Sequence, residues 1–479
     1  MYKVVDILTY EITVNGIPII PEEIRVSAFP FNRVWPGKQR DIDQSEIAYM
    51  VRIIDDSPQF IRIESKTDFD SLAIRPLGKG IKAVREGNAV SFKLEEHGCY
   101  TVEFDGENHA IHLFFERKRD FAEYGTPTYS FGAGEHYPNL INLKSGDSVF
   151  IAEGAVVHGS LYGIDISDIK IYGYGVLDAG WEERREKNGD VGWDGEADFA
   201  PEKVHTYGGV RFYRSKDITI DGITVIDPAS YAISFFGSDD ISINQVKVVG
   251  LWKYNNDGID FFNCRRVKLS DSFVRSFDDS VCIKGITAFS YNNSEDILVE
   301  NCVLSCNWGL TCEIGLATAC EEIKNITFRN CDLIHNCNVC LDISNGQWAN
   351  VHDVLFENIN VEYSRFTKKP VYQNSDEQKY AQSDEIQFPL LARVHDGRRN
   401  WAGNKSDDDV RCKNGNITFR DINVIIDEEI KDMPRVEIKR CMAISDFYNI
   451  RFENIVVNQK RIKELSELGT DEDPAVTLN

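Results

Sequence analysis

The chain has 479 residues, a formal net charge of −24 at pH 7 and a pI near 4.9. An acidic balance of this size argues against nucleic acid and anionic membranes as partners, because both need a basic surface that displaces counterions. No segment approaches the ~18 consecutive apolar residues of a membrane span, and no cationic run followed by an apolar run opens the chain. We therefore expect a cytoplasmic protein, too long for one ordinary core.

The first 125 residues have the pattern of short antiparallel strands. Residues 90–94 alternate apolar and polar side chains, and residues 100–113 are typical of two strands that turn at Asp105-Gly106. An N-terminal β-sandwich over residues 1–125 is predicted.

A short unit recurs from about residue 165, in which Asp or Asn precedes alternating β-branched residues. The interval is 23 residues from Asp217 to Asp240 and 29 from Asp296 to Asn325. This period and its strand-forming residues indicate a solenoid of strands rather than of helices. We predict a right-handed parallel β-helix over residues 126–479. The unit begins at Asp168, Asp217, Asp240, Asp296, Asn325, Asp353, Asn416 and Asn449.

The dipeptide Asn-Cys recurs in this pattern, starting at Asn263, Asn301 and Asn330. Cysteine in such a ladder behaves as a small buried hydrophobe, so we expect core packing by free thiols. Only Cys337 and Cys340 have a Cys-x-x-Cys spacing, which is two ligands short of a structural zinc site. We expect neither a metal nor a cofactor.

Three carboxylates lie about one coil apart. Asp257 precedes Asp278 by 21 residues and Asp279 by 22, and matching positions on neighbouring coils are about 5 Å apart. Both paired acids can face one cleft only if the backbone bends between them, so a bend is predicted there. Crowded carboxylates raise at least one pKa, and a protonated acid beside an ionised one suits glycoside hydrolysis. Acids on adjacent coils favour the ~6.5–9.5 Å gap of an inverting enzyme.

Two motifs give the chain a resemblance to polygalacturonase-like glycoside hydrolases of family 28. Asn255-Asn256-Asp257 matches the Asn-x-Asp motif of that family, and Asp278-Asp279 matches its paired acids. The combination of a β-sandwich and a β-helix resembles the related dextranases. This resemblance implies that Asp278 is the general acid and that Asp257 and Asp279 hold and activate the water.

The sequence departs from polygalacturonases at two further motifs. Where they carry Gly-His-Gly, this chain has Asn307-Trp308-Gly309, and where they carry Arg-Ile-Lys to grip galacturonate, it has Asp342-Ile343-Ser344. An acid in place of two cations would repel a uronate. We therefore expect a neutral or weakly charged oligosaccharide or polysaccharide as substrate.

Further candidates surround the three acids in the predicted coils. Lys284 could return to the same face after the bend and hold the paired acids, or contact a sugar hydroxyl. Trp308 could stack on a sugar ring or cap the core, and Glu313 and Asp342 could bond hydroxyls. The irregular stretch 363–413 adds three more candidates for substrate binding: Arg393, His395 and Trp401.

Two other functions remain open. A β-helix polysaccharide lyase would use its acids to bind calcium and an Arg or Lys as base, and a noncatalytic carbohydrate-binding protein would keep the acids without turnover. Exposed faces of a solenoid also support a homo-oligomer.

Overall fold

The computed structural model describes residues 9–28, 42–182, 208–286, 292–366, 389–397, 413–440, 446–470 and 472–479. These residues form strands and short 3₁₀ turns, as the all-β prediction requires. No helix within these ranges is long and apolar enough to cross a membrane. The chain divides into two compact units, one from Met1–Arg25 and Glu46–Asp120, the other from Val26–Ser45 and Phe121–Asn479. The predicted boundary at residue 125 stays a prediction.

The N-terminal strands form the predicted β-sandwich, with two five-stranded sheets around one apolar core. Ile61 and Ile63 from one sheet and Val102 from the other belong to the same buried cluster. Their alternation with outward-facing residues is what a sheet with one buried face requires. The first sheet has the order β2 (Ile17–Ile19), β1 (Tyr10–Val14), β5 (Gln59–Ser65), β8 (Ala89–Leu94) and β7 (Ala83–Glu86). The second has the order β3 (Glu22–Ser27), β4 (Ser45–Ile54), β10 (Ile111–Glu116), β9 (Gly98–Phe104) and β6 (Leu72–Arg75).

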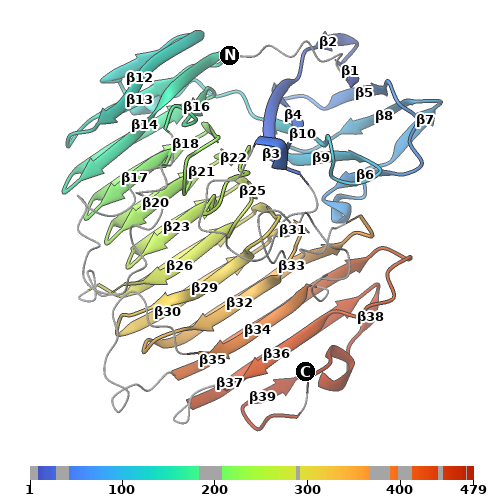
Figure 1. Ribbon diagram of the computed structural model, residues 1–479, viewed down its shortest axis with the longest axis vertical. Helices are drawn as coiled ribbons and strands as arrows, with labels where there is room; N and C mark the ends of the chain where they lie inside the picture. Colours follow the sequence, from blue (N-terminus) through green and yellow to red (C-terminus); the bar gives the residue numbers. More distant parts are fainter. Residues whose placement is uncertain are drawn as a thin grey trace. The chain divides into compact units, whose positions relative to one another are not determined.

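The second unit is a right-handed parallel β-helix, with 29 strands among its described residues, and this confirms the predicted fold (Figure 1). Each coil passes through three columns of parallel strands, here called A, B and C. Three long strands, β33 (Asn350–Tyr363), β35 (Lys413–Ile426) and β37 (Asp446–Val457), run through both B and C. The first turns and the end of the unit are formed by β11 (Tyr129–Phe131), β12 (Gly134–Asn142), β13 (Ser148–Ile151), β14 (Ala155–Ile164), β38 (Lys460–Arg461) and β39 (Val476–Leu478).

Column A carries the candidate site described below. It consists of β17 (Val210–Tyr213), β20 (Ile233–Phe236), β23 (Ile259–Phe262), β26 (Val281–Gly285), β29 (Leu310–Thr318), β32 (Val339–Asn345), β34 (Leu390–Asp396) and β36 (Arg435–Lys439). Column B begins with β15 (Ser167–Gly173), β18 (Lys216–Asp221), β21 (Asp239–Asn244), β24 (Arg265–Ser270), β27 (Ser294–Glu300) and β30 (Glu322–Arg329). Column C begins with β16 (Val176–Asp178), β19 (Thr224–Ile226), β22 (Lys247–Val248), β25 (Phe273–Ser276), β28 (Val303–Cys306) and β31 (Asp332–His335).

The interior of the β-helix is a stack of equivalent apolar side chains. Phe235 lies between Phe212 and Phe261 with ring centroids 5.8 and 5.5 Å apart, close to the spacing of successive coils. Cysteines occupy the same kind of position, namely Cys264, Cys302, Cys312, Cys320, Cys331 and Cys340, and all ten cysteines in the described part of the chain are buried and form no disulfide. The prediction of core packing is confirmed for these six thiols.

The turns of the coils are built from Asn and Asp in the left-handed backbone conformation, which these two residues tolerate better than other side chains. Asn301, Asn330 and Asn358 have φ angles of 57°, 54° and 52°. Their side-chain amides also bond from coil to coil: Asn358 donates to Asn330 at 2.8 Å, and Asn330 donates to Asn301 at 3.3 Å. We call this row, which continues to Asp271, the asparagine ladder. The recurring Asn and Asp of the sequence are therefore turn residues that also tie the coils together.

Candidate active site

The three predicted acids lie on loops that lead from column C into column A. Asp257 precedes β23, and Asp278 and Asp279 lie one coil later, between β25 and β26. The backbone bends at Asp278 before entering β26, as predicted. Main-chain hydrogen bonds lock the two loops together: the amide of Gly258 donates to the carbonyl of Asp279 at 2.7 Å, and the amide of Asp278 donates to Asn256 at 3.1 Å.

Two glycines allow the acids to approach one another. A Cβ on Gly258 would lie 2.4 Å from the carbonyl oxygen of Ser280, and one on Gly309 would lie 2.5 Å from both the amide nitrogen and Oδ1 of Asp279. Neither approach leaves room for a side chain. Gly309 thus supports Asp279 directly, and the amide of the next residue, Leu310, donates to Asp279 Oδ1 at 2.9 Å.

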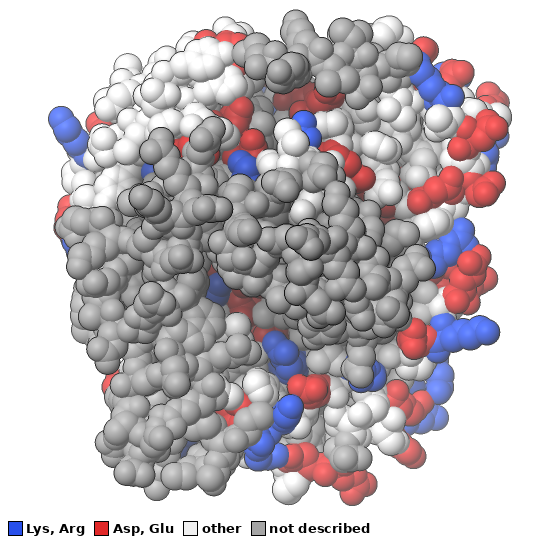
Figure 2. Space-filling model, in the orientation of Figure 1, with Lys and Arg blue, Asp and Glu red and all other residues white. Residues whose placement is uncertain are grey.

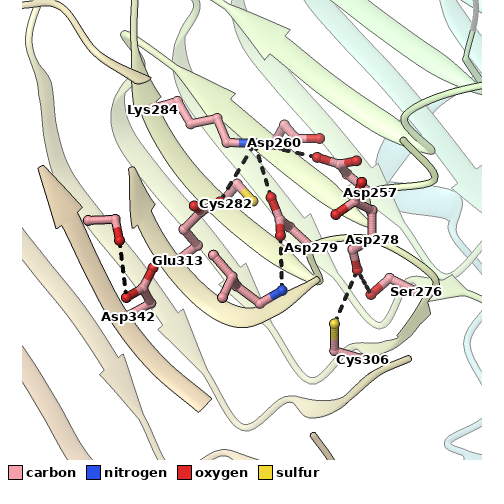
Figure 3. Close-up of polar contacts among 12 residues, drawn as sticks. Asp257, Asp260, Ser276, Asp278, Asp279, Cys282, Lys284, Cys306, Glu313 and Asp342 are labelled. Atoms are coloured by element: carbon pink, nitrogen blue, oxygen red, sulfur yellow. Dashed lines mark hydrogen bonds and ion pairs between the residues drawn. The ribbon is translucent and has the colours of Figure 1, made fainter. Parts of the chain in front are cut away.

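Asn256 and Asp278 are fixed through hydrogen bonds. The Asn256 carboxamide accepts from the amides of Trp252 and Lys253 at 3.0 and 2.7 Å, so it holds the loop that carries Asp257. The main-chain carbonyl of Asp278 accepts from Ser276 Oγ at 2.6 Å and from Cys306 Sγ at 3.3 Å (Figure 3). The backbone around each acid is therefore set by buried polar groups.

Lys284 lies at the centre of the carboxylates, where the sequence placed it as a residue that could hold the paired acids (Figure 3). Its Nζ is 3.4 Å from Asp257 Oδ2 and 3.3 Å from Asp279 Oδ2. It is also 3.4 Å from Asp260 Oδ1 and 3.7 Å from Glu313 Oε2. We call these four acids and Lys284 the acid–lysine cluster.

Burial and crowding separate the pKa values of the four acids. Burial, followed by Asp260 and Asp278, raises the pKa of Asp257 well above its ordinary value. Burial also raises the pKa of Asp260 to about 6, and together with the charge of Asp279 it raises the pKa of Glu313. Burial acts in the same direction on Asp279, but Lys284, Glu313 and the Leu310 amide outweigh it and lower the pKa of that carboxyl. Asp279 is thus the one acid of the cluster whose ionised form the surroundings favour.

Three side chains of the site are close enough together to share a metal ion. One oxygen each of Asp257 and Asp279 and the sulfur of Cys282 lie within 4.8 Å of one another. The Lys284 ammonium lies beside both carboxylates, however, and burial lowers its pKa less than Cys282 and the surrounding acids raise it. The protein therefore already supplies a positive charge at this point.

A row of unlike polar side chains crosses column A beneath the acids. In the strand register, Asp260 lies opposite Cys282, Cys282 opposite Glu313, and Glu313 opposite Asp342. The row continues from Asp342 to Arg393 on β34. We call these five residues the polar row. Every carboxylate in it is fully buried, so its members depend on one another for compensation of charge.

Asp260 and Cys282 were not predicted. Cys282 Sγ donates to Glu313 Oε2 at 3.2 Å, and Asp260 contributes one of the four carboxylates around Lys284. A signal for Asp260 does exist in the sequence, because it is the only charged residue in Ile259–Phe262, an otherwise apolar strand. An unpaired charge at such a position is costly, so it implies a partner.

The polar row changes the interpretation of Asp342. Arg393 binds it through two parallel hydrogen bonds, with Nε–Oδ1 at 2.7 Å and Nη2–Oδ2 at 2.9 Å. The acid that was expected to repel a uronate is therefore neutralised by the next coil. Both oxygens of Asp342 are engaged, and the Glu313 carboxyl is fully buried among protein groups, so neither presents an oxygen at the surface for a sugar hydroxyl.

The remaining candidates occupy different settings. Trp308 is half-buried and stacks on Phe277 with centroids 5.6 Å apart and ring planes 10° apart, within a cluster that includes Tyr254. One face of its ring is thus used in packing, the alternative to sugar stacking that the sequence left open. His395 lies two residues beyond Arg393 on β34, and burial followed by the charge of that arginine lowers its pKa. Trp401 lies outside the described residues.

Residues 151–388, which contain the three acids, match the model of the glycosyl hydrolases of family 28. Rhamnogalacturonase B of Aspergillus niger is 28% identical over 149 residues, which are 31% of this chain and 25% of that protein. Probable rhamnogalacturonase A of Aspergillus oryzae is 25% identical over 149 residues, covering 31% of this chain and 30% of the relative. The chain thus spans between 25 and 30% of the length of these relatives. The predicted resemblance to family 28 is confirmed.

Two solved structures share the fold. Dex49A from Penicillium minioluteum has a TM-score of 0.59 at 12% identity and covers 98% of this chain and 94% of its own. The family 28 exopolygalacturonase of Yersinia enterocolitica has a TM-score of 0.50 at 14% identity, covering 89% of this chain and 97% of its own. At these identities the likeness concerns architecture, and it agrees with the predicted β-helix.

Proposed function

We propose that this relative of family 28 is a glycoside hydrolase that cleaves a pectin-type polysaccharide, or oligosaccharides derived from one, with inversion at the anomeric carbon. The observation that carries this proposal is the arrangement of Asp257 and Asp279, which have oxygens within 4.8 Å of each other and share Lys284, with Asp278 on the same turn. Two carboxylates that can hold one water beside a third acid are the groups that an inverting hydrolysis needs.

The environment of each acid supports a division of roles. Asp279 is kept ionised, so it is suited to accept a proton from the attacking water. Asp257 has a raised pKa and can hold the same water as a hydrogen-bond donor. Asp278 then protonates the leaving oxygen. The C–O bond of the linkage breaks, the water oxygen bonds to the anomeric carbon from the opposite face, and its proton passes to Asp279.

The choice of a pectin-type substrate follows from the relatives and from a correction to the electrostatics. The curated relatives described above are named rhamnogalacturonases. The sequence favoured a neutral sugar because Asp342 replaces two cations, but Arg393 compensates that charge. On the face drawn in Figure 2, the described acidic and basic side chains are interspersed. The physical reason for excluding uronates is thereby removed.

The cluster also speaks against the alternative of a calcium-dependent lyase. Such an enzyme abstracts a proton with an uncharged Arg or Lys, which requires a lowered pKa. Lys284 is surrounded by four acids, and its pKa is raised rather than lowered. Burial by itself lowers the pKa of Arg393, but Asp342 outweighs burial, so this pKa is raised as well. Neither cation is suited to act as the base.

The test is proton NMR of the first-formed product from a panel of pectin fragments and neutral oligosaccharides, with wild type and Asp278→Asn. We expect hydrolysis of a pectin fragment with an inverted anomer and a loss of about 10³-fold or more in kcat for the variant. A retained anomer would reject inversion, and an unsaturated product would show a lyase. Absence of turnover across the panel would instead support a noncatalytic carbohydrate-binding protein.

A further inference from the structure

We propose that Lys284 and Glu313 are the positioning residues that keep Asp279 ionised: the lysine by its charge, and the glutamic acid as a proton-bearing donor held beneath the site. The proposal rests on the hydrolase function above and assigns roles to two residues that do not touch the reacting atoms. It also changes the part expected of Glu313, from contact with a sugar hydroxyl to control of a neighbouring carboxylate.

Charge counting requires that the acid–lysine cluster retain protons. Four carboxylates face one ammonium at distances of 3.3 to 3.7 Å, so full ionisation would leave three uncompensated negative charges in one buried site. Such a state is strongly unfavourable, because burial penalises each charge and the like charges repel. Some of the acids therefore stay protonated near neutral pH, and the surroundings decide which ones.

Glu313 is placed to be one of the protonated acids. Its side chain is fully buried, and its Oε2 already accepts the Cys282 thiol at 3.2 Å. Among the described residues, Oε1 has no hydrogen-bond partner, and Lys284, at 3.7 Å, is closer to the other three acids. A buried carboxyl with so little compensation holds its proton.

The proton on Glu313 has a clear acceptor in Asp279. Both carboxyls face the Lys284 ammonium, Asp279 at 3.3 Å and Glu313 at 3.7 Å, and the interaction between them lowers the pKa of Asp279 and raises that of Glu313. A neutral acid that donates to a carboxylate stabilises its charge without adding a second one. Lys284 at 3.3 Å and the Leu310 amide at 2.9 Å stabilise the same charge from other directions.

Arg393 isolates this arrangement from the rest of the polar row. Asp342 is the next acid along the row, opposite Glu313, and would otherwise compete for the positive charge of Lys284. Because Arg393 binds both oxygens of Asp342 through two N–H groups, the charge of Lys284 remains available to the cluster. The other titratable groups that bear on the cluster are Asp278, the Cys282 thiol and the Tyr231 hydroxyl, and burial is the main cause that raises the pKa of the last two.

The first experiment compares the pH profile of kcat/KM for wild type, Lys284→Met, Glu313→Gln and Glu313→Met. Activity needs ionised Asp279, so it is lost as the pH falls through the acidic limb, which reports the coupled cluster. Removing the ammonium should move this limb upward by about one to three pH units. Glu313→Met cannot donate a hydrogen bond and should move the acidic limb upward by about one pH unit. Glu313→Gln keeps an N–H donor and should leave the limb close to its wild-type position.

Lys247 provides a matched control for loss of a buried lysine. It lies on β22, is 1% exposed, and its Nζ donates to the Gln245 carbonyl at 2.8 Å. Lys247→Met should lower the unfolding midpoint while leaving the acidic limb in place. An acidic limb at the same pH in wild type, Lys284→Met and Glu313→Met would overturn the proposal. A limb of Glu313→Gln at the same pH as that of Glu313→Met would also overturn it.

A second readout separates this proposal from the proposed function. The Asp279 carboxyl can be titrated by ¹³C NMR in the full chain labelled at aspartate, with Asp279→Asn to assign its signal. We expect a pKa below the ordinary value in wild type and above it in Lys284→Met. If no substrate is hydrolysed but this difference is found, the function fails and the positioning role stands. If hydrolysis is found but Asp279 titrates alike in both proteins, the positioning role is wrong.

Discussion

The asparagine ladder and the polar row both consist of polar side chains stacked along the same solenoid, yet they are built on opposite principles. In the ladder, each asparagine amide bonds the equivalent residue of the neighbouring coil, as Asn358 does to Asn330 at 2.8 Å, and this residue is again asparagine except at Asp271. In the polar row each residue differs from its neighbours, and the row is buried. Like side chains in the ladder meet one another's need for hydrogen bonds and carry no charge to another group. Unlike partners in the polar row instead hold charges and protons at particular residues. In this solenoid, a repeated polar residue indicates a structural role, and a change of polar residue from coil to coil indicates the candidate active site.

The largest effect on stability is expected where the polar row depends on one pair. Arg393→Met would leave Asp342 buried and uncompensated, which should lower the free energy of unfolding by about 3–5 kcal/mol. Urea unfolding of the variant measures this loss. The double variant Asp342→Leu/Arg393→Met removes both charges and should recover most of the stability. Failure of the double variant to recover would mean that the pair acts through packing rather than charge.

A side chain at Gly309, which supports Asp279, should have an effect of nearly the same size, but on catalytic activity rather than on stability. A methyl group at this position collides with the Asp279 amide and carboxylate at 2.5 Å, and a displacement of about 1 Å can reduce kcat about 100-fold. Gly309→Ala is therefore expected to lower kcat by about that factor on whichever pectin fragment wild type cleaves. Gly132→Ala, where an added Cβ meets nothing within 4 Å, is the control. Equal kcat values for both variants would contradict the role given to Gly309.

Asp260 offers a test of how the polar row responds to pH. Its pKa is about 6 in the folded protein against about 3.9 in an unfolded chain, so the folded state holds a proton that the unfolded state has released. Stability contributed by this group is complete below pH 4 and is lost as the pH rises through 6. Asp260→Asn should therefore be more stable than wild type by about 3 kcal/mol at pH 7.

The same variant should equal wild type at pH 4, where both side chains are neutral. Urea unfolding at the two pH values gives the comparison. A gain of equal size at both would show that the effect is one of packing and not of ionisation.

The asparagine ladder should show the smallest effect and no dependence on pH. Asn330→Ala places alanine at a φ of 54° and removes two exposed side-chain hydrogen bonds, which should cost about 1.5 kcal/mol with kcat unchanged. Asn330→Gly loses the same hydrogen bonds but tolerates the backbone, so it should cost less. If glycine were as costly as alanine, the hydrogen bonds rather than the φ angle would dominate.

The sequence was informative where the fold repeats. Asp217, Asp240 and Asn325 stand at equivalent turns, and all have φ near 55°, so one local rule repeated along the chain was sufficient to predict the β-helix. The acids at 257, 278 and 279 were found for the same reason, because one coil of ordinary length separates them. The bend at Asp278 followed from the alternation of strand residues.

The polar row was not predictable, because its members are brought together by coils of unequal length. The separation is 31 residues from Cys282 to Glu313 and 51 from Asp342 to Arg393. No periodic search relates such positions, and each residue taken singly has an ordinary interpretation. Uronates were excluded wrongly for this reason, because Arg393, which neutralises Asp342, lies beyond a long insertion in the sequence.

The register of the polar row also bears on how a protein of this kind can change its length. The asparagine ladder alone would allow a coil to be duplicated or lost, since any asparagine can bond to any other. The coils from β23 to β34 have no such freedom, because each carries the one group that completes its neighbour. We therefore expect these coils to be inherited, or transplanted, as a single block, and lengthening of the solenoid to be tolerated outside it.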